Sequence, residues 1–182
     1  WNYEIINSFS NRLDWVSLSL NPSTFRDSML FDKFSDKIDC KGCSDSTGCS
    51  IGSNTGLPWS IEFIEKYKSK FDFNHLSANN KLPWSEFLID KYIDRWDFEN
   101  LSMNEKLPWS LPFLKKYFKE SDFENILFRT NPGINSIFEI VEEFHPLMDW
   151  YVICENPNLP WYEKNLLERW KNYISWFGIA GN

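Results

Sequence analysis

Three of the four cysteines in this chain of 182 residues lie close together, in the stretch CKGCSDSTGCS. Cys40, Cys43 and Cys49 have the spacing C-x2-C-x5-C, and two cysteines separated by two residues often form half of a tetrahedral zinc site. A fourth ligand is required, and the repeat described below places His75 one unit further along the chain. We therefore predict a structural zinc site of three cysteines and one histidine. The alternatives are an insertion with free thiols, or one disulfide in an oxidising compartment.

The cysteines belong to a chain that repeats itself. Three stretches align without gaps at a period of 25 residues, starting at Leu57, Leu82 and Leu107, and each begins with the letters LPWS. Fainter copies lie on both sides, so that almost the whole chain is an array of about six units. Three near-identical copies at a fixed spacing indicate a repeat architecture.

One unit of the array is longer than the others. Asp39 and Asp72 hold equivalent positions but are 33 residues apart, 8 more than the period of 25, and the three clustered cysteines lie between them. The sequence thus predicts one repeat domain over residues 1–182, with a cysteine-containing insertion at about 40–56. Cys154 lies too far along the array to join the zinc site, unless the array closes on itself. It aligns instead with Ser19, Ser77 and Ser102.

Each unit is predicted to contain a long helix, a turn, a short helix and a second turn. In WSEFLIDKYID, Ser85 is a typical N-cap, and apolar residues three, four and seven positions later form one helical stripe of about 10–11 residues. In WDFENLSMN, Asp97 is expected to cap a helix of one to two turns. Asn104 follows where the chain needs a left-handed or side-chain-bonded turn. The equivalent positions are Ser60 and Ser110 for the cap, and Asn21, Asn79 and Asn156 for the turn.

A unit of this kind cannot bury its apolar stripe alone, so neighbouring units must stack. The predicted fold is therefore all-α, a short α-solenoid of helix-turn-helix repeats. The alternative is a solenoid that contains strands and resembles a leucine-rich repeat, because a period of 25 residues lies within that range. In the stretch FNHLSANNKLP, however, Asn74 and Lys81 would then occupy apolar positions of the leucine-rich motif.

The array also resembles a known kind of repeat. The likeness is carried by Trp96-Asp97-Phe98, Leu101-Ser102, Asn104 and Leu107-Pro108-Trp109, and by their copies. This pattern resembles tryptophan-rich tandem repeats in uncharacterised proteins of giant viruses and some bacteria, and it covers nearly the whole chain. The resemblance implies a helical repeat scaffold and brings no known reaction or ligand. The chain departs from the pattern at the cysteine insertion and at RTNPGINSIFEIV.

The tryptophans of the LPW letters form a second candidate site. They are Trp59, Trp84, Trp109 and Trp161. A row of tryptophans could form a stacking groove for a peptide or an aromatic ligand. The alternative is that they build the contacts between units, because every interface in a repeat array is the same interface and requires the same residue.

The composition bears on the kind of partner. The formal net charge is −7 and the isoelectric point is about 4.9, which argues against a nucleic-acid backbone or an anionic membrane as the main partner. A basic protein suits this charge. No apolar run approaches the roughly 18 residues that a membrane span needs. Nothing in the sequence marks a compartment, and we expect a cytoplasmic or virion-associated protein rather than a secreted one.

Three functional hypotheses follow. The first is a non-enzymatic protein-binding or scaffold protein, such as a neutralising partner of a basic protein. The second is a structural component of a larger assembly, such as a virus particle. The third is a metal-dependent enzyme with its metal at the cysteines, although the chain has no recognisable nucleophile motif or phosphate-binding glycine loop and only 2 histidines.

Overall fold

The protein is built from helices. The computed structural model describes residues 1–38, 51–119, 137–156 and 159–180, and it contains no β-strand in these ranges. The prediction of an all-α protein is therefore confirmed, and the described residues give no support to a strand-containing fold. None of the described helices combines the length and the apolar character needed to cross a bilayer.

The contacts divide the chain into two compact units, Trp1–Asn100 and Leu101–Asn182. The helices of the first unit are α1 Tyr3–Ser8, α2 Trp15–Leu20, α3 Ser28–Phe34, the 3₁₀ turn η1 Ile51–Ser53, α4 Ile61–Tyr67, α5 Phe73–Ala78 and α6 Glu86–Lys91. Helix α7, Phe98–Ser102, spans the boundary. The second unit holds α8 Leu111–Tyr117, α9 Ile137–Phe144, the 3₁₀ turn η3 His145–Leu147, α10 Trp150–Cys154, α11 Lys164–Trp170 and α12 Trp176–Ala180. The single domain over residues 1–182 stays a prediction.

The predicted caps begin the helices. The hydroxyl of Ser60 accepts a hydrogen bond from the Phe63 N–H at 3.1 Å, and Ser85 and Ser110 do the same in α6 and α8. Each hydroxyl satisfies one of the N–H groups that the first helical turn leaves without a partner. The aspartate caps are also confirmed, since Asp72 accepts from the Asn74 N–H at 3.0 Å.

The long helices are shorter than the sequence predicted. Helix α4 has 7 residues and α6 has 6, against the expected 10–11. Just beyond each helix an aromatic residue, Phe71 or Trp96, folds back onto the tryptophan that precedes the helix. Trp96 lies 5.0 Å from Trp84 between ring centres, and its indole N–H donates to the Ile89 carbonyl in the last turn of α6. The Ile89 carbonyl thus accepts both from this indole and from the Tyr92 backbone N–H at 3.2 Å, where the helix ends.

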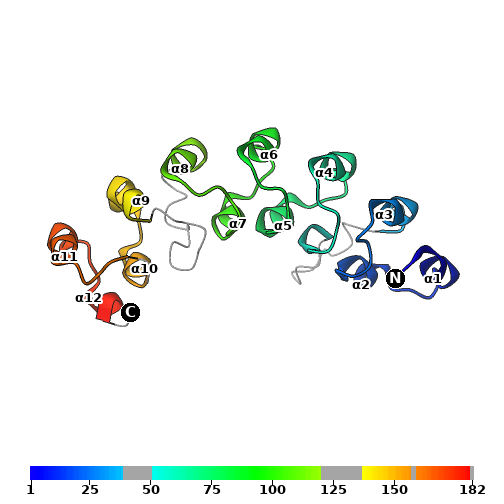
Figure 1. The fold of residues 1–182 in the computed structure, drawn as a ribbon, viewed down its shortest axis with the longest axis horizontal. Helices are drawn as coiled ribbons and strands as arrows, with labels where there is room; N and C mark the ends of the chain where they lie inside the picture. The colour runs from blue at the N-terminus through cyan, green and yellow to red at the C-terminus, as the bar shows by residue number, and fades with distance from the viewer. Residues whose placement is uncertain (39–50, 120–136, 157–158, 181–182) are drawn as a thin grey trace. The chain divides into compact units, whose positions relative to one another are not determined.

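Two rows of elements build the first unit, with α3, α4 and α6 in one row and α2, η1 and α5 in the other (Figure 1). Aromatic rings join neighbouring helices. Phe31 of α3 packs edge-on against Phe63 and Tyr67 of α4, at 5.0 and 4.7 Å between ring centres. Phe73 of α5 lies 5.2 Å from Tyr92 at the end of α6. Such edge-to-face pairs stabilise a core beyond the area that they bury.

The second unit has an aromatic core of its own. Trp170 of α11 contacts Phe138 of α9 at 5.7 Å and Trp150 of α10 at 5.4 Å between ring centres. Ile140 and Val141 of α9 are fully buried beside them. Within this unit α9 and α11 lie on one side, and α10 and α12 on the other (Figure 1).

Candidate functional site

The LPW tryptophans close the turn in which they lie. The indole N–H of Trp84 donates to the Asn79 carbonyl at 2.8 Å. The same bond, from each tryptophan to the asparagine five residues earlier, recurs for Trp59, Trp109 and Trp161 at 2.8 to 3.1 Å. The polar edge of each indole is thus used within its own turn. Whether the indole faces form a binding groove stays a prediction.

The asparagines of these turns are buried and tie one segment to the next. Asn54 donates its amide to the Ser19 carbonyl at 2.5 Å, and Asn79 donates to the Gly52 carbonyl at 2.7 Å. Each asparagine also accepts from the backbone two residues ahead, at 2.8 Å for Gly56 and 2.9 Å for Lys81. This is a side-chain-bonded turn with an extended backbone at Asn79, so the left-handed alternative is wrong there.

Asn54 was missed as a member of this series. It lies five residues before Trp59, as Asn79 lies five before Trp84, and it is followed by the letters LPW. That spacing could have identified it. In the structure, Asn54 is recognised as a member of the series because its side-chain amide donates to the carbonyl of Ser19, 35 residues earlier, across the longer unit.

In two of the short helices, α5 and α10, a small side chain accepts a hydrogen bond from the segment that follows. The Ser77 hydroxyl donates to the Phe73 carbonyl and accepts from the Asp97 N–H at 3.0 Å. Cys154, which aligns with Ser77, holds the equivalent position, because its sulfur accepts from the Ser175 N–H at 3.2 Å. Burial raises the pKa of the Cys154 thiol, so the side chain stays neutral and serves as a packing residue.

Only one of the four predicted zinc ligands can be placed. Cys40, Cys43 and Cys49 lie outside the described residues. His75 is half-exposed on α5, and its Nδ1 lies 2.8 Å from the Asp72 carboxylate. The 3₁₀ turn that follows Cys49 packs on α5, where a Cβ added at Gly52 would lie 3.3 Å from the His75 Cβ. The described ranges hold no metal-binding group of three or more His, Cys, Asp or Glu residues. The zinc site stays a prediction.

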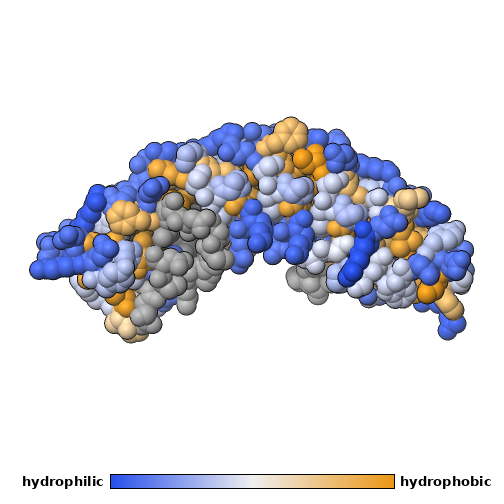
Figure 2. Space-filling view, viewed as in Figure 1, coloured by the Kyte–Doolittle hydropathy of each residue, from blue (hydrophilic) through white to orange (hydrophobic). Residues whose placement is uncertain are grey.

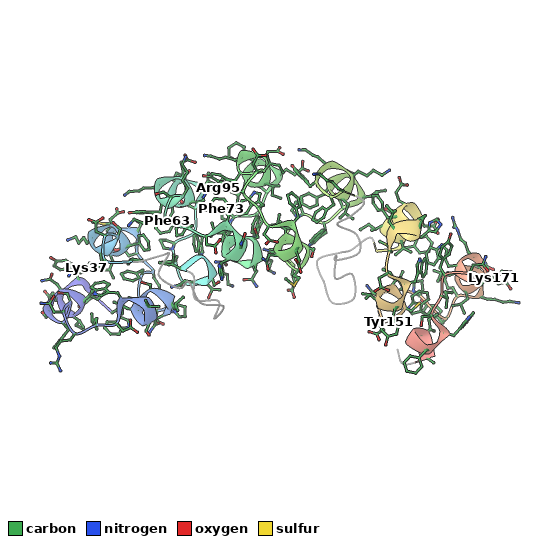
Figure 3. The ribbon with its side chains drawn as sticks, turned by 180° about the vertical axis from the view of Figure 1, so that it is seen from behind. Lys37, Phe63, Phe73, Arg95, Tyr151 and Lys171 are labelled. Atoms are coloured by element: carbon green, nitrogen blue, oxygen red, sulfur yellow. The ribbon has the colours of Figure 1, made fainter. Side chains whose placement is uncertain are left out.

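Basic side chains connect successive long helices at their C-terminal ends. Arg95 donates to the Lys68 carbonyl at 3.2 Å, and its guanidinium carbon lies 3.8 Å from the centre of the Phe73 ring (Figure 3). Lys70 donates to the Ser35 carbonyl at 2.6 Å. In both cases a cation satisfies a carbonyl at the end of the preceding helix, where the helix dipole is negative.

A carboxylate hub joins α4 to α6. Glu65 of α4 accepts from the Tyr92 hydroxyl at 2.5 Å and forms ion pairs with Lys68 at 2.5 Å and Lys91 at 3.0 Å. The hydrogen bonds from Lys68, Tyr92 and Lys91 lower the pKa of Glu65 to about 2. Burial, with the neighbouring carboxylate, holds the pKa of Tyr92 well above its usual value.

The corresponding position between α3 and α4 is an open cleft of about 400 Å³. Asp32 of α3 forms an ion pair with Lys66 of α4 at 2.6 Å. Tyr67 lines the cleft but is only 7% exposed, and the Lys66 ammonium lies 5.3 Å from the centre of its ring. The remaining lining residues are Ser28, Pro58, Ser60, Glu62 and Phe63. On the face of the molecule shown in Figure 2, hydrophilic and hydrophobic residues are mixed over the region of α3 and α4.

These features define an all-α protein in which buried asparagine and tryptophan side chains tie consecutive turns together. No family model, curated protein or solved structure matches the chain.

Proposed function

We propose that this protein is a non-enzymatic repeat scaffold that binds another protein, and that its fold is a short α-solenoid of about six helix-turn-helix units. The observation that carries the proposal is the buried asparagine series. Asn54 and Asn79 each donate to a carbonyl two residues before the preceding asparagine of the series, Ser19 before Asn21 and Gly52 before Asn54. A contact reused between successive segments is what a stacked array requires. The assignment to the tryptophan-rich repeat family stays part of this proposal.

The internal contacts support a binding role because of where the polar groups are used. The asparagines, the cap serines and the indole N–H groups hold the array together, while the outer surface of the long helices differs from unit to unit. At the second helical position after the cap, the exposed residue is Met29 in α3, Glu62 in α4 and Phe87 in α6. A constant interior with a variable surface is typical of repeat proteins that bind partners.

The proposed partner is a protein with a basic surface. The formal net charge of −7 favours such a partner, because complementary charge speeds encounter and suppresses wrong partners. Neutralisation of a basic protein is the specific form of this proposal.

The solenoid can be tested by deleting one repeat. Removal of residues 82–106 joins Lys81 directly to Leu107, so that the letters KLPWS at the junction are preserved. We expect the shortened chain to fold cooperatively with an unchanged helical content per residue in circular dichroism. A control deletion of about half a period, residues 82–94, joins Lys81 to Arg95, breaks the register and should unfold the protein. If both deletions unfold, the stacked-repeat proposal is wrong.

The binding role can be tested by capture of a partner on the immobilised full chain from its native source. We expect one dominant basic protein that forms a complex of defined stoichiometry in light scattering, with an affinity that falls as salt rises. Ordered self-assembly without a partner would favour the assembly component instead. The absence of both results would contradict the proposed function.

A further inference from the structure

We propose that one copy of this chain binds a second copy head to tail, with α1 of one copy against α11 and α12 of the other. The inference goes beyond the proposed function, and it rests on the repeat packing that the proposed function also uses. In both faces, the exposed apolar residues hold positions that a neighbouring unit covers elsewhere in the chain. The second copy thus supplies the contacts that a neighbouring unit supplies inside one chain.

Neighbouring units contact each other through fixed positions, counted from the cap of each long helix. The third and seventh residues after the cap pack on the fourth residue of the preceding long helix, as Phe63 and Tyr67 of α4 pack on Phe31 of α3. The seventh residue also covers the first residue of the preceding short helix, at 5.2 to 5.6 Å between ring centres. These pairs are Phe34 on Trp15, Tyr92 on Phe73 and Trp170 on Trp150.

The covering side of this contact is exposed on α1. Residues 1–14 align without a gap with residues 84–97, so that Ile5, Phe9 and Leu13 lie three, seven and eleven positions after the cap of α1. Phe9 is 48% exposed, whereas Tyr92 at the same position of α6 is 6% exposed. Ile5 is likewise exposed, whereas its counterpart Leu88 is fully buried. Helix α1 thus presents the side chains that cover a preceding unit elsewhere in the chain.

The receiving side of the contact is exposed on α11 and α12. Leu167 lies four positions after the cap of α11 and is partly exposed, whereas Ile64 and Ile89 at that position are buried. Trp176 begins α12 and is 59% exposed, whereas Phe73 at the start of α5 is 5% exposed. The two positions that receive a following unit therefore carry an accessible leucine and an accessible tryptophan.

A basic residue belongs to the same contact. Ten positions after the cap, Arg95 donates to the Lys68 carbonyl at 3.2 Å, and its guanidinium carbon lies 3.8 Å from the centre of the Phe73 ring. Lys70 holds this position after the cap of α4 and donates to the Ser35 carbonyl at 2.6 Å. Both carbonyls lie eight positions after the cap of the preceding long helix.

The two end faces carry the partners for this third element. Arg12 lies ten positions after the cap of α1 and is exposed, and Lys171 lies eight positions after the cap of α11. In the proposed contact, the Arg12 guanidinium of one copy covers the Trp176 ring of the second copy and donates to its Lys171 carbonyl. Tryptophan attracts a cation over its ring more strongly than phenylalanine does, so the contact is at least as favourable as that of Arg95 with Phe73.

The two faces differ, so the contact is heterologous, and a copy that has bound at one face keeps the other face open. Association therefore continues beyond a dimer unless the copies close into a ring. The outer surface of the long helices takes no part in this contact and stays accessible to a partner protein.

Sedimentation velocity of the full chain over a concentration series measures the association. We expect the average mass to rise with concentration. Trp176→Ala should weaken the association by about tenfold or more, because buried tryptophans dominate many protein contacts. Phe177→Ala is the matched control. Phe177 lies on the same helix and is 81% exposed, but its position is also exposed in α5, α7 and α10, so its removal should leave the association unchanged.

Mixing two blocked variants tests the head-to-tail direction. Phe9→Asp blocks the α1 face and Trp176→Asp blocks the α12 face, so each variant alone should stay monomeric. Their equimolar mixture keeps one intact face of each kind, and it should form a 1:1 dimer that does not grow further. If circular dichroism shows that Phe9→Asp fails to fold, Arg12→Glu at an exposed residue takes its place.

Three results would overturn the inference: a wild type that stays monomeric up to about 1 mM, a blocked variant that dimerises alone, or equal weakening by Phe177→Ala and Trp176→Ala. The two proposals fail separately. A monomeric wild type that captures a partner overturns the head-to-tail contact and keeps the scaffold. Head-to-tail association without capture of any partner keeps the contact and contradicts the binding role.

Discussion

Asn79→Ala is the most direct test of the buried asparagine series. The side chain of Asn79 is 4% exposed. Its amide donates to the Gly52 carbonyl at 2.7 Å, and its side-chain oxygen accepts from the Lys81 N–H at 2.9 Å. Alanine removes these two bonds and a longer one from the amide to the Asn54 carbonyl at 3.4 Å, but it keeps the backbone carbonyl that accepts from Trp84. The substitution therefore isolates the contribution of the side chain.

The expected loss of stability follows from the two backbone groups that lose their partner. A buried polar group left without its partner costs about 1–3 kcal/mol. The Gly52 carbonyl is inside the protein and loses a short bond, whereas the Lys81 N–H is nearer the surface and can bind water. We therefore expect Asn79→Ala to lower the free energy of unfolding by about 2–4 kcal/mol.

Urea denaturation followed by circular dichroism measures this loss, with the slope m compared between variants. Asn80→Ala is the matched control, because the neighbouring asparagine is exposed and should cost less than about 0.5 kcal/mol. Asn79→Asp keeps the acceptor for Lys81 but places a carboxylate oxygen against the Gly52 carbonyl, so it should cost at least as much as alanine. Equal stability of Asn79→Ala and Asn80→Ala would refute the structural role of the asparagine.

Four further results are expected. In chemical denaturation, Trp84→Ala should lower the free energy of unfolding by about 3–5 kcal/mol. Trp84→Phe should lower it by about 1 kcal/mol. A loss below about 1 kcal/mol for the alanine variant would mean that the indole packs poorly. The pKa of Glu65 is about 2 in the folded protein, below its usual 4.5. The ionised Glu65 should therefore stabilise the protein fully above about pH 4.5, and this stabilisation should be lost as the pH falls to about 2. The difference in melting temperature between wild type and Glu65→Gln should shrink over that range. A difference that does not change with pH would contradict this. Gly56→Ala places a Cβ 1.8 Å from the Pro22 carbonyl oxygen and should lower the free energy of unfolding by about 3 kcal/mol or more. An unchanged melting temperature would contradict this prediction. Native mass spectrometry should find one zinc on the wild type and none on Cys43→Ser, and metal-free wild type with three reactive thiols would end the zinc prediction.

Helix starts could be predicted from the sequence, and helix ends could not. Ser60 and Ser85 cap their helices through bonds that span three residues, so the local sequence contains both partners. Just beyond the ends of α4 and α6, Phe71 and Trp96 pack their rings on Trp59 and Trp84. That contact forms only when the turn has folded back, and helical periodicity carries no information about it.

The candidate sites divide in the same way. The spacing of Asn79 and Trp84 predicted a turn, and the alignment of Cys154 with serines placed it in the role that the structure shows. The reach of Asn54 to Ser19 was not predicted, because the two residues are 35 positions apart across an insertion.

By itself the sequence determined the all-α class, the caps and the period of 25 residues, because these depend on neighbours within one or two turns. Only the tertiary structure decided which of two similar carboxylates meets the tyrosine of the next helix. Asp32 and Glu65 look alike in sequence, and both have a lysine and a tyrosine at matching positions in the next helix. One methylene group decides whether the carboxylate meets the tyrosine hydroxyl, and that distance exists only when the two helices pack side by side.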